Sequence, residues 1–278
     1  MSETMVSHSP KTDKRVIPSS DSPAAFARSG DSGTVNRTLR LLSCFAEQER
    51  WGLNDLAKAL NLPKATMHRL LGLCKPLNFV MQDTDGLYQP GLALYRLAGK
   101  LASEMPLNQL AEPILRDVRD RTDETVLLTL LDRGELQMYF SLSASPAHPL
   151  RYTIQLNRLQ PLSWGATARS LLAFLSPQEI DEVIRRAEPS PLNGRPLSAD
   201  ELSAALAQIR QQGYAVSYAE RAPEAHGVSV PFFDNQGQVR GNLTLTVPDF
   251  RFDAAKLPAW IALLRESAAA LTCRLGWS

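Results

Sequence analysis

Histidine and serine side chains are the first candidates for chemistry in this chain of 278 residues. Its four histidines are far apart in the sequence and no two have metal-ligand spacing: His8, His68, His148 and His226. The chain also lacks a Gly-x-Ser-x-Gly elbow, a phosphate-binding loop and a dinucleotide fingerprint. A serine hydrolase using Ser229 or Ser163 with His226 is the alternative, although chance supplies such pairs in any chain of this length. The sequence therefore predicts a protein that is not an enzyme, with no catalytic residue, no metal site and no cofactor.

The three cysteines do not indicate a metal site either. Cys44, Cys74 and Cys273 form no pair with metal-ligand spacing, and each lies in a helical pattern beside apolar neighbours. This pattern favours buried, reduced thiols, with a reactive cysteine as the less favoured alternative.

Residues 61–74 have the pattern of a turn followed by a short helix. Pro63 is suited to the first position of that helix, and Asn61 just before it suits a turn or a cap. Apolar residues then recur at i, i+3, i+4 and i+7, which ties one face of the helix to a core: Met67, Leu70, Leu71 and Cys74.

The opposite face of this helix carries small residues around one arginine. Ala65, Arg69 and Gly72 lie on it, flanked by Thr66 and His68. Small side chains let a helix backbone approach a phosphate-edged groove, and a guanidinium can donate to a guanine edge or a phosphate. A surface helix of an ordinary bundle remains the alternative for this stretch alone.

Two further helices are expected before the helix at 63–74. A first helix is expected to open at Thr34 or Asn36, and a second short helix follows Gly52. Their expected core residues are Val35, Leu39, Leu42, Cys44 and Phe45 in the first, and Leu53, Leu56, Ala57 and Leu60 in the second. Two short helices joined by a three- or four-residue turn form a helix-turn-helix.

A small hairpin is expected directly after the helix-turn-helix. Two strand-like runs, 79–81 and 87–89, flank a turn that ends in Asp85-Gly86. Such a hairpin is a wing, so residues 34–90 are predicted to form a winged helix-turn-helix that binds DNA. A winged helix that binds only protein is the alternative.

Composition and charge agree with a DNA-binding front half. The chain is 44% apolar and 21% charged, which is typical of a globular protein. Residues 34–105 hold nine Lys/Arg against six Asp/Glu, whereas residues 106–278 hold 17 against 19. The chain has no apolar run long enough for a membrane helix and no signal-peptide pattern, so we expect a cytoplasmic protein without a membrane partner.

Changes in composition and the positions of Pro and Gly divide the chain into a tail, two domains and a linker. Residues 1–33 are rich in Ser, Pro, Asp and Gly and are expected to be a disordered tail. After Pro90-Gly91, residues 91–105 are expected to form a linker helix whose apolar stripe packs against a second subunit. Pro106 marks the start of a second domain, residues 106–278.

The second domain alternates in blocks of strands and helices. A helix at 107–121 precedes strands at 125–131, 136–142 and 150–156, and three helices follow at 165–175, 177–187 and 199–212. Ser198 and Glu201 have the spacing of a capping box for the last of these helices. Strands at 214–218, 227–233 and 239–247 and a final helix at 254–275 complete the domain. This order indicates an α+β domain, an antiparallel sheet with helices to one side.

The order of parts and several motifs resemble the IclR family of bacterial transcription regulators. In the front half the resemblance rests on residues 35–42, 53–71 and Gly86-Leu-Tyr-Gln-Pro-Gly, and further on it rests on Glu124-Thr-Val, Pro161-Leu-Ser-Trp-Gly-Ala-Thr-Ala and Gly213-Tyr-Ala-Val. The resemblance implies a mainly α N-terminal winged helix-turn-helix domain plus an α+β GAF-like C-terminal domain with an antiparallel sheet. It also implies a homodimer or a dimer of dimers that acts as a repressor or an activator and binds small organic acids.

The resemblance also assigns effector-binding positions. The loop-to-helix entry at Ala166 and Thr167 would offer backbone N–H groups to a ligand carboxylate, as helix N-termini do for anions. Thr244 and Thr246 are two apart, so their hydroxyls share one face of a strand, although alternating threonines are also ordinary strand formers. The remaining positions carried over from the family are Ser217, Ala225 and Gly227.

Some positions depart from the family pattern. Ser163-Trp164 replaces a common histidine, His226-Gly227 replaces Arg followed by Cys or Ser, and Ser217 replaces a common acidic residue. A pocket with less charge and a wall formed by Trp164 would suit a carboxylate on an apolar or aromatic body.

Together these features predict a regulator whose DNA affinity depends on an effector. Symmetric dimers would place residues 63–74 in successive major grooves of a pseudo-palindromic operator, with Arg69 and Thr66 nearest the base edges. Lys64, Arg37 and the wing at Gly86 would contact phosphates. The predicted DNA contacts are Arg37, Lys64, Ala65, Thr66, His68, Arg69 and Gly86. The alternative is a ligand-sensing adaptor whose winged helix binds a protein partner.

Overall fold

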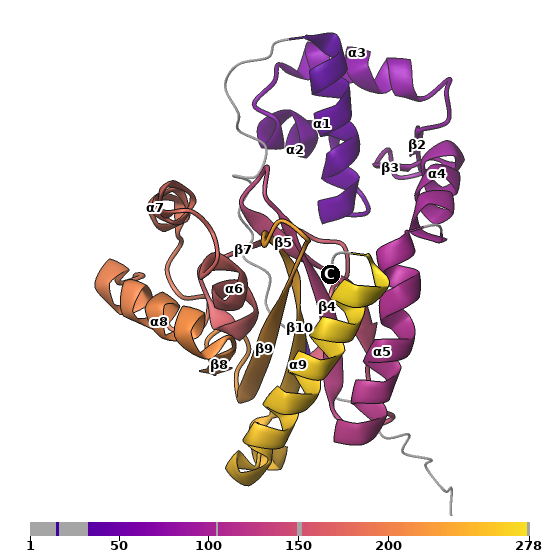
Figure 1. The fold of residues 1–278 in the computed structure, drawn as a ribbon. Coiled ribbons are helices and arrows are strands. Elements are labelled where there is room, and N and C mark those ends of the chain that lie inside the picture. The colour runs from indigo at the N-terminus through magenta and orange to yellow at the C-terminus, as the bar shows by residue number, and fades with distance from the viewer. Residues whose placement is uncertain (1–14, 17–32, 104, 149–151, 277–278) are drawn as a thin grey trace, which may run out of the picture.

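The computed structural model describes residues 15–16, 33–103, 105–148 and 152–276. Its N-terminal part contains α1 (Thr34–Glu47), α2 (Leu53–Ala59) and α3 (Lys64–Cys74), followed by the antiparallel hairpin of β2 (Val80–Gln82) and β3 (Tyr88–Pro90). These elements lie together at one end of the molecule (Figure 1). They enclose one core, to which α3 contributes Met67, Leu70, Leu71 and Cys74. The predicted winged helix-turn-helix is therefore confirmed.

The start of α3 differs from the prediction by one residue. Pro63 is the N-cap rather than the first helical residue, and its carbonyl accepts the N–H of Met67 at 3.0 Å. Asn61 has a φ of 51°, a left-handed conformation that asparagine adopts more readily than most residues. The turn between α2 and α3 is thus made by Asn61, and Pro63 fixes the direction in which α3 leaves it.

The predicted core face of α1 is partly wrong. Leu41 and Cys44 are buried, but the side chains of Val35 and Leu39 are 73% and 61% exposed. Apolar residues occur on both sides of this helix, and the domain covers only one side. The other side, with Val35 and Leu39, is exposed.

Two helices lead into the second domain. A helix, α4 (Leu92–Ser103), lies where the linker was expected, and none of its described side chains is buried. The next helix, α5 (Pro106–Thr122), continues through Pro113 and packs its buried side chains against the sheet.

The sheet of the second domain has six strands in the order β7-β5-β4-β10-β9-β8, and every neighbouring pair is antiparallel. From edge to edge these are β7 (Gln160–Pro161), β5 (Gln137–Ala144), β4 (Thr125–Asp132), β10 (Val239–Pro248), β9 (Ala225–Phe233) and β8 (Ala215–Tyr218). Short β6 (Tyr152–Thr153) pairs with β1 (Arg15–Val16) in parallel outside this sheet. The predicted antiparallel α+β domain is confirmed.

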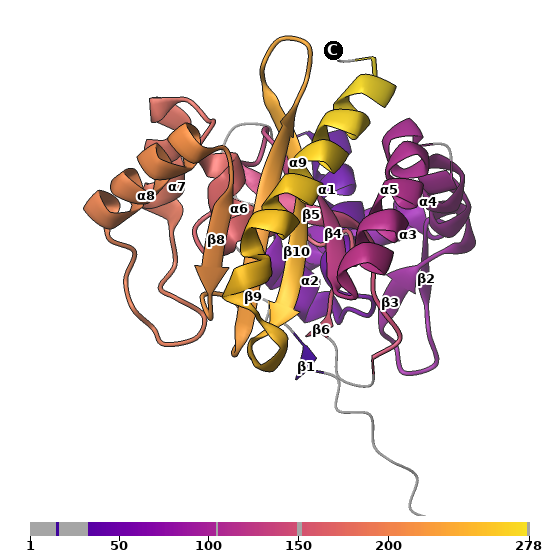
Figure 2. The ribbon, with the colours of Figure 1, turned by 60° about the horizontal axis from the view of Figure 1, so that its bottom comes forward.

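Helices cover both faces of this sheet, so the expectation that they lie to one side is wrong (Figures 1 and 2). One face packs against α5 and α9 (Leu257–Arg274), and the other packs against α6 (Gly165–Leu172) and α8 (Ala199–Gln212). Alternation along β10 explains this arrangement, because Leu243 and Leu245 enter the core with α5 and α9. Thr244, which lies between them, faces α6.

Several local predictions need correction. Ser198 caps α8 by accepting the N–H of Glu201 at 3.4 Å, but the side chain of Glu201 pairs with Arg195. A complete capping box occurs instead at Ser176 and Glu179, at the start of α7 (Pro177–Arg186). The strand expected at 150–156 is described only as β6, and 149–151 lie outside the described residues. The last predicted helix begins as a separate turn, η3 (Ala254–Lys256), which follows η2 (Asp249–Arg251).

Two of the three cysteines are buried, and most of the predicted tail is not described. Cys44 and Cys74 are buried as expected, but Cys273 is exposed near the end of α9. The predicted tail, 1–33, lies outside the described residues except for β1 and Gly33. Among the described helices, none combines the length and the apolar composition needed to cross a membrane.

Candidate DNA interface and effector site

The free face of α3 is the face predicted to meet DNA. Lys64, Ala65, His68 and Arg69 are exposed, and Thr66 is half-buried. A Cβ atom added to Gly72, on the same side, would have no neighbour within 4 Å, so this face is open. Among the residues that the structure describes, none covers the side chain of Arg69 enough to bury it.

The other two predicted DNA contacts lie on different elements. Arg37 is in the first turn of α1 and is half-buried, whereas Gly86 is exposed at the wing, with a φ of 79° that favours glycine. Three elements, α1, α3 and the wing, therefore supply the predicted residues.

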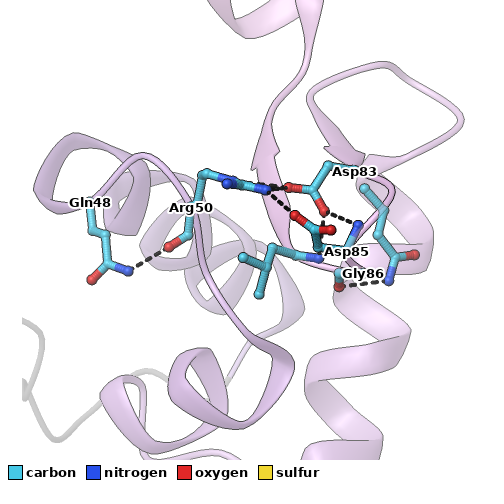
Figure 3. Close-up of polar contacts among 7 residues, drawn as sticks. Gln48, Arg50, Asp83, Asp85 and Gly86 are labelled. Atoms are coloured by element: carbon cyan, nitrogen blue, oxygen red, sulfur yellow. Dashed lines mark hydrogen bonds and ion pairs between the residues drawn. The ribbon is translucent and has the colours of Figure 1, made fainter.

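The wing is held by an ion-pair cluster that the sequence did not reveal. Arg50, in the loop before α2, donates to the carboxylates of Asp83 and Asp85, with 3.0 Å to Asp85 (Figure 3). The second oxygen of Asp83 accepts the N–H groups of Asp85 and Leu87, both at 2.9 Å. Hydrogen bonding to Arg50 lowers the pKa of Asp83 below its ordinary value. Arg50 therefore neutralises part of the negative charge that Asp83 and Asp85 place on the wing turn.

Part of the predicted effector set converges at the start of α6. A Cβ atom on Gly227 would be 3.3 Å from the Cβ of Ala166 and 3.2 Å from the Oγ of Ser217. Ser217, Gly227 and Thr246 also form one row across β8, β9 and β10. The N–H of Ala166 donates to Ser217 Oγ at 2.8 Å. The helix entry and this row of strand residues therefore form one cluster.

Thr167 and Thr244 belong to a buried hydrogen-bond network just beneath this cluster. Their hydroxyl oxygens are 3.2 Å apart, and Thr244 Oγ1 is 2.8 Å from Ser229 Oγ. The amide of Asn242 donates to the carbonyl of Thr167 at 2.7 Å and to Ser170 Oγ at 2.8 Å. All these side chains are buried. Thr244 is therefore already hydrogen-bonded within the protein, and the sequence missed the partners that engage it.

The same network excludes a pairing of Ser229 with His226. Ser229 Oγ contacts Ser170 and Thr244, while His226 Nε2 lies 2.8 Å from Asp249 and its ring stacks on Phe252. Ser229 and His226 are three residues apart on β9, so their side chains point to opposite faces of the sheet. His226 therefore cannot act as a base for Ser229 in this arrangement.

Two predicted effector residues lie apart from the cluster. The indole N–H of Trp164 donates to the carbonyl of Glu188 at 3.0 Å, and the guanidinium of Arg169 lies 6.0 Å from its ring centroid. Ala225 packs against Tyr152 and Ala222. Trp164 is therefore fixed at the border of the cluster, and Ala225 belongs to a neighbouring small core.

A carboxylate of the protein occupies the start of α6. Glu220 accepts the first N–H of the helix, that of Gly165, at 3.0 Å. Arg169 pairs with both oxygens of Glu220 at 2.9 Å. Since helix N-termini favour anions, Glu220 is a favourable partner for Gly165, next to the amides of Ala166 and Thr167 that were predicted to meet an effector carboxylate. No local signal in the sequence indicates this, because Glu220 and Gly165 are 55 residues apart.

A separate cavity of about 510 Å³ lies between α5 and the end of β5. Arg116, Arg119, Ser143 and Tyr152 are among the residues that line it. None of its lining residues belongs to the predicted effector set.

Two family profiles match the chain. A profile described as "Bacterial transcriptional regulator IclR C-terminal" matches residues 99–273, and one described as "IclR helix-turn-helix domain" matches residues 34–73. Together they cover both halves of the described structure.

Similar proteins and structures cover nearly the whole chain. The regulator KipR of Bacillus subtilis is 25% identical over 88% of this chain and 98% of its own length. XynR of Escherichia coli is 27% identical over 88% and 97%. The crystal structure of a putative IclR regulator from Silicibacter is 25% identical, with a TM-score of 0.80 over 88% of this chain and 97% of that chain. An IclR homologue from Microbacterium hydrocarbonoxydans in complex with 4-hydroxybenzoate is 23% identical, with a TM-score of 0.72 over 88% and 100%.

Proposed function

The chain belongs to the IclR family of bacterial transcriptional regulators, and from this premise we propose that a small organic acid controls its affinity for DNA. DNA binding and transcription regulation follow from family membership, whereas the acid, the contact residues and the assembly are our proposals. The family consists of regulators rather than enzymes, as the similar proteins also are. We place the activity in the bacterial cytoplasm because its DNA target lies there.

The free face of α3 is the observation that supports the DNA contacts. Its exposed residues surround Arg69, and its buried residues hold the helix against α1 and α2. We propose that α3 enters the major groove, and that Lys64, Arg37 and the wing at Gly86 contact phosphates. Ala65, Thr66 and His68 flank Arg69 on the groove side.

Fluorescence anisotropy with DNA from upstream of the protein's own gene and its neighbouring genes tests this proposal. Specific binding should exceed binding to random DNA and should fall steeply as salt rises. Binding to a protein partner that is insensitive to salt, with no binding to DNA, would support the adaptor alternative.

We propose that residues 34–90 and 106–278 act as separate domains, joined by the linker helix at 91–105, and that the protein acts as a homodimer or a dimer of dimers. Val35 and Leu39 of α1 and several apolar side chains of α4 are exposed: Leu92, Tyr95, Leu97 and Leu101. Exposed apolar helix faces of this kind are covered in subunit interfaces. A second copy would cover them and bring two α3 helices to a pseudo-palindromic operator.

Light scattering coupled to size-exclusion chromatography tests the assembly. Leu97→Glu together with Leu101→Glu should reduce the measured mass toward that of one chain, since two carboxylates would be buried in the interface. An unchanged mass would place the interface elsewhere.

The convergence of Ala166, Ser217 and Gly227 at the start of α6 supports the effector proposal. Thr246 lies in the same row of strand residues, and Thr167 and Thr244 lie in the buried network beneath it. Trp164 is at the border of the cluster, and Ala225 is in the neighbouring small core. A helix N-terminus and hydroxyl groups suit a carboxylate, and the apolar neighbours suit its body, aromatic bodies included.

A thermal-shift screen of carboxylic acids, each compared with its neutral amide, tests the effector proposal. We expect acids to raise the midpoint and to change tryptophan fluorescence, because Trp164 lies beside the cluster. Equal shifts with acids and amides would contradict an acid effector. If only small hydrophilic acids bound, the aromatic part of the proposal would be wrong.

A further inference from the structure

Arg221 lies in the loop between β8 and β9, directly against the start of α6. Its aliphatic stem covers Gly165, where an added Cβ would be 2.9 Å from Arg221 Cδ. Gly165 also has a φ of 87°, so glycine is favoured there both by the backbone and by Arg221. The guanidinium donates to the side-chain oxygen of Gln160 on β7. Arg221 therefore spans from the helix entry to the edge strand of the sheet.

Arg221 has no carboxylate partner among the described residues, whereas neighbouring arginines do. Its neighbour Glu220 pairs with Arg169, and at the end of the sheet Arg251 pairs with Glu124 at 2.8 Å. Within the described part of the chain, no carboxylate pairs with Arg221, and its acceptor is the neutral amide of Gln160. A guanidinium has five N–H donors, so most of its hydrogen-bonding capacity is unused.

Burial makes this imbalance significant. Burial lowers the pKa of the Arg221 guanidinium to about 10. Even at that value the side chain remains a cation at neutral pH, and a counter-ion stabilises a cation that is partly buried. The side chain is only partly accessible to solvent, which leaves a small ligand a way to reach it.

Two amides at the start of α6 are already hydrogen-bonded in the free protein. Glu220 accepts the N–H of Gly165, and Ser217 accepts that of Ala166. An incoming acid would have to displace a tethered carboxylate from both Gly165 and Arg169. The cation left without a matching charge is Arg221.

We propose that Arg221 binds the carboxylate of the effector and makes this protein selective for acids over neutral analogues. The inference rests on the proposed effector function and adds to it the residue that recognises charge. A bidentate pair with a carboxylate would use donors that are idle in the free protein. Glu220 and Arg169 then form the fixed side of the site, and the body of the acid extends toward Ala166 and Gly227.

The test compares three probes on the full-length protein and two variants. Formate is the smallest carboxylate and enters any pocket that admits one, benzoate adds an aromatic body, and benzamide is its neutral counterpart. Calorimetric titration and thermal shift are measured for the wild type, Arg221→Met and Arg221→Lys. Arg221→Met keeps most of the stem that covers Gly165, and Arg221→Lys keeps the charge. Arg185→Ala, at an exposed arginine of α7, is the control variant.

We expect formate and benzoate to stabilise the wild type more than benzamide does. Arg221→Met should weaken benzoate binding by about tenfold or more and abolish the preference over benzamide, while Arg221→Lys keeps part of it. Absence of any carboxylate effect on the wild type, or an equal effect on Arg221→Met, would overturn the inference.

DNA binding measured on the same preparations separates this inference from the proposed function. Arg221→Met should bind DNA like the wild type without acid, because Arg221 is outside the DNA-binding domain. If Arg221→Met keeps its preference for benzoate, the inference fails and the effector proposal stands. If the wild type binds DNA but neither carboxylate, both the inference and the acid effector fail while DNA regulation stands.

Discussion

Arg69 is the residue on which sequence-specific DNA binding is expected to depend most. It is exposed, and its neighbours on α3, Ala65 and Gly72, are too small to block a groove. If Arg69 donates two hydrogen bonds to a guanine, Arg69→Ala should weaken binding to the specific site by about 1–3 kcal/mol. Binding to random DNA should fall much less, and anisotropy titrations on both DNAs measure the difference.

The control for Arg69 is Arg185→Ala on the surface of α7, which removes the same charge away from α3. It should change neither affinity. An equal loss on specific and random DNA for Arg69→Ala would assign Arg69 to a phosphate.

Glu179 makes the stability of the second domain depend on pH in acid. Its carboxylate pairs with Arg133 at 2.6 Å and accepts the N–H of Ser176 at 2.8 Å. Hydrogen bonding to Arg133 is the largest cause that lowers the pKa of Glu179 to about 2. Because the folded pKa is lowered, the pair stabilises the fold above the ordinary value of 4.5 and loses this effect as pH falls toward 2.

Arg133→Ala should therefore destabilise the protein by about 1 kcal/mol at pH 7, since Arg133 is largely exposed and solvent screens the pair. The difference from the wild type should shrink steadily between pH 4.5 and pH 3. Urea unfolding at several pH values measures it. A difference that is independent of pH would mean that Arg133 acts through its contact with Gln238 instead.

Only some residues of the proposed effector site could be predicted from the sequence, and Ala166 shows why. Its position at a helix start was readable from local sequence, as was the pairing of Thr244 and Thr246 on one strand face. Its partner Ser217 is 51 residues away, and Glu220 and Arg221 are no closer in sequence. Side chains that satisfy a site from distant loops leave no periodic pattern, so only the fold reveals them.

Among the elements, the wing has an unusual charge. Its turn carries Asp83 and Asp85, which both pair with Arg50. Asp83 also holds the turn by accepting two backbone N–H groups, whereas Asp85 is exposed and supplies mainly charge. The two carboxylates should therefore respond differently to substitution.

Asp85→Asn should tighten DNA binding by about threefold at low salt, because it removes a negative charge near the phosphates and leaves Arg50 more available. Asp83→Ala should weaken binding by loosening the turn. Anisotropy titrations over a range of salt concentrations measure both. Weaker binding by Asp85→Asn would show that Arg50 must be held by both carboxylates to act.

The elements themselves were predictable where periodicity was strong, as in α3, α8 and the hairpin of β9 and β10. Periodicity did not reveal what each apolar or polar face of a helix or strand packs against. Val35 and Leu39 are apolar residues at helical spacing, yet they are exposed because the domain ends on the other side of α1. Similarly, β10 alternates leucine with threonine, and the threonine face is buried under α6 by a polar network rather than left to solvent. This explains why helices were expected on one face of the sheet and occur on both.

At the scale of the whole molecule, an ion pair joins the two domains. Glu47 is the last residue of α1, and its carboxylate lies 3.2 Å from the Nε of Arg158 in the loop between β6 and β7. Both side chains are less than one-fifth exposed. Arg158 precedes Gln160, the acceptor of Arg221, by two residues. The loop at 154–159 therefore contacts the DNA-binding domain and continues directly to the proposed effector site.

This arrangement predicts that the Glu47–Arg158 pair fixes the orientation of α1 for DNA binding. Glu47→Gln and Arg158→Gln should each change operator affinity by a few-fold in the same direction, and the double variant should show no further change. Arg158→Lys should remain close to the wild type because it keeps the charge. A symmetric dimer binds two half-sites only if its two α3 helices are the correct distance apart. Loss of the ion pair would let α1 and its domain move, so binding to both half-sites should weaken. Anisotropy titration of the four variants measures these effects, and additive losses in the double variant would show that the two residues act separately, with the domains held by other contacts.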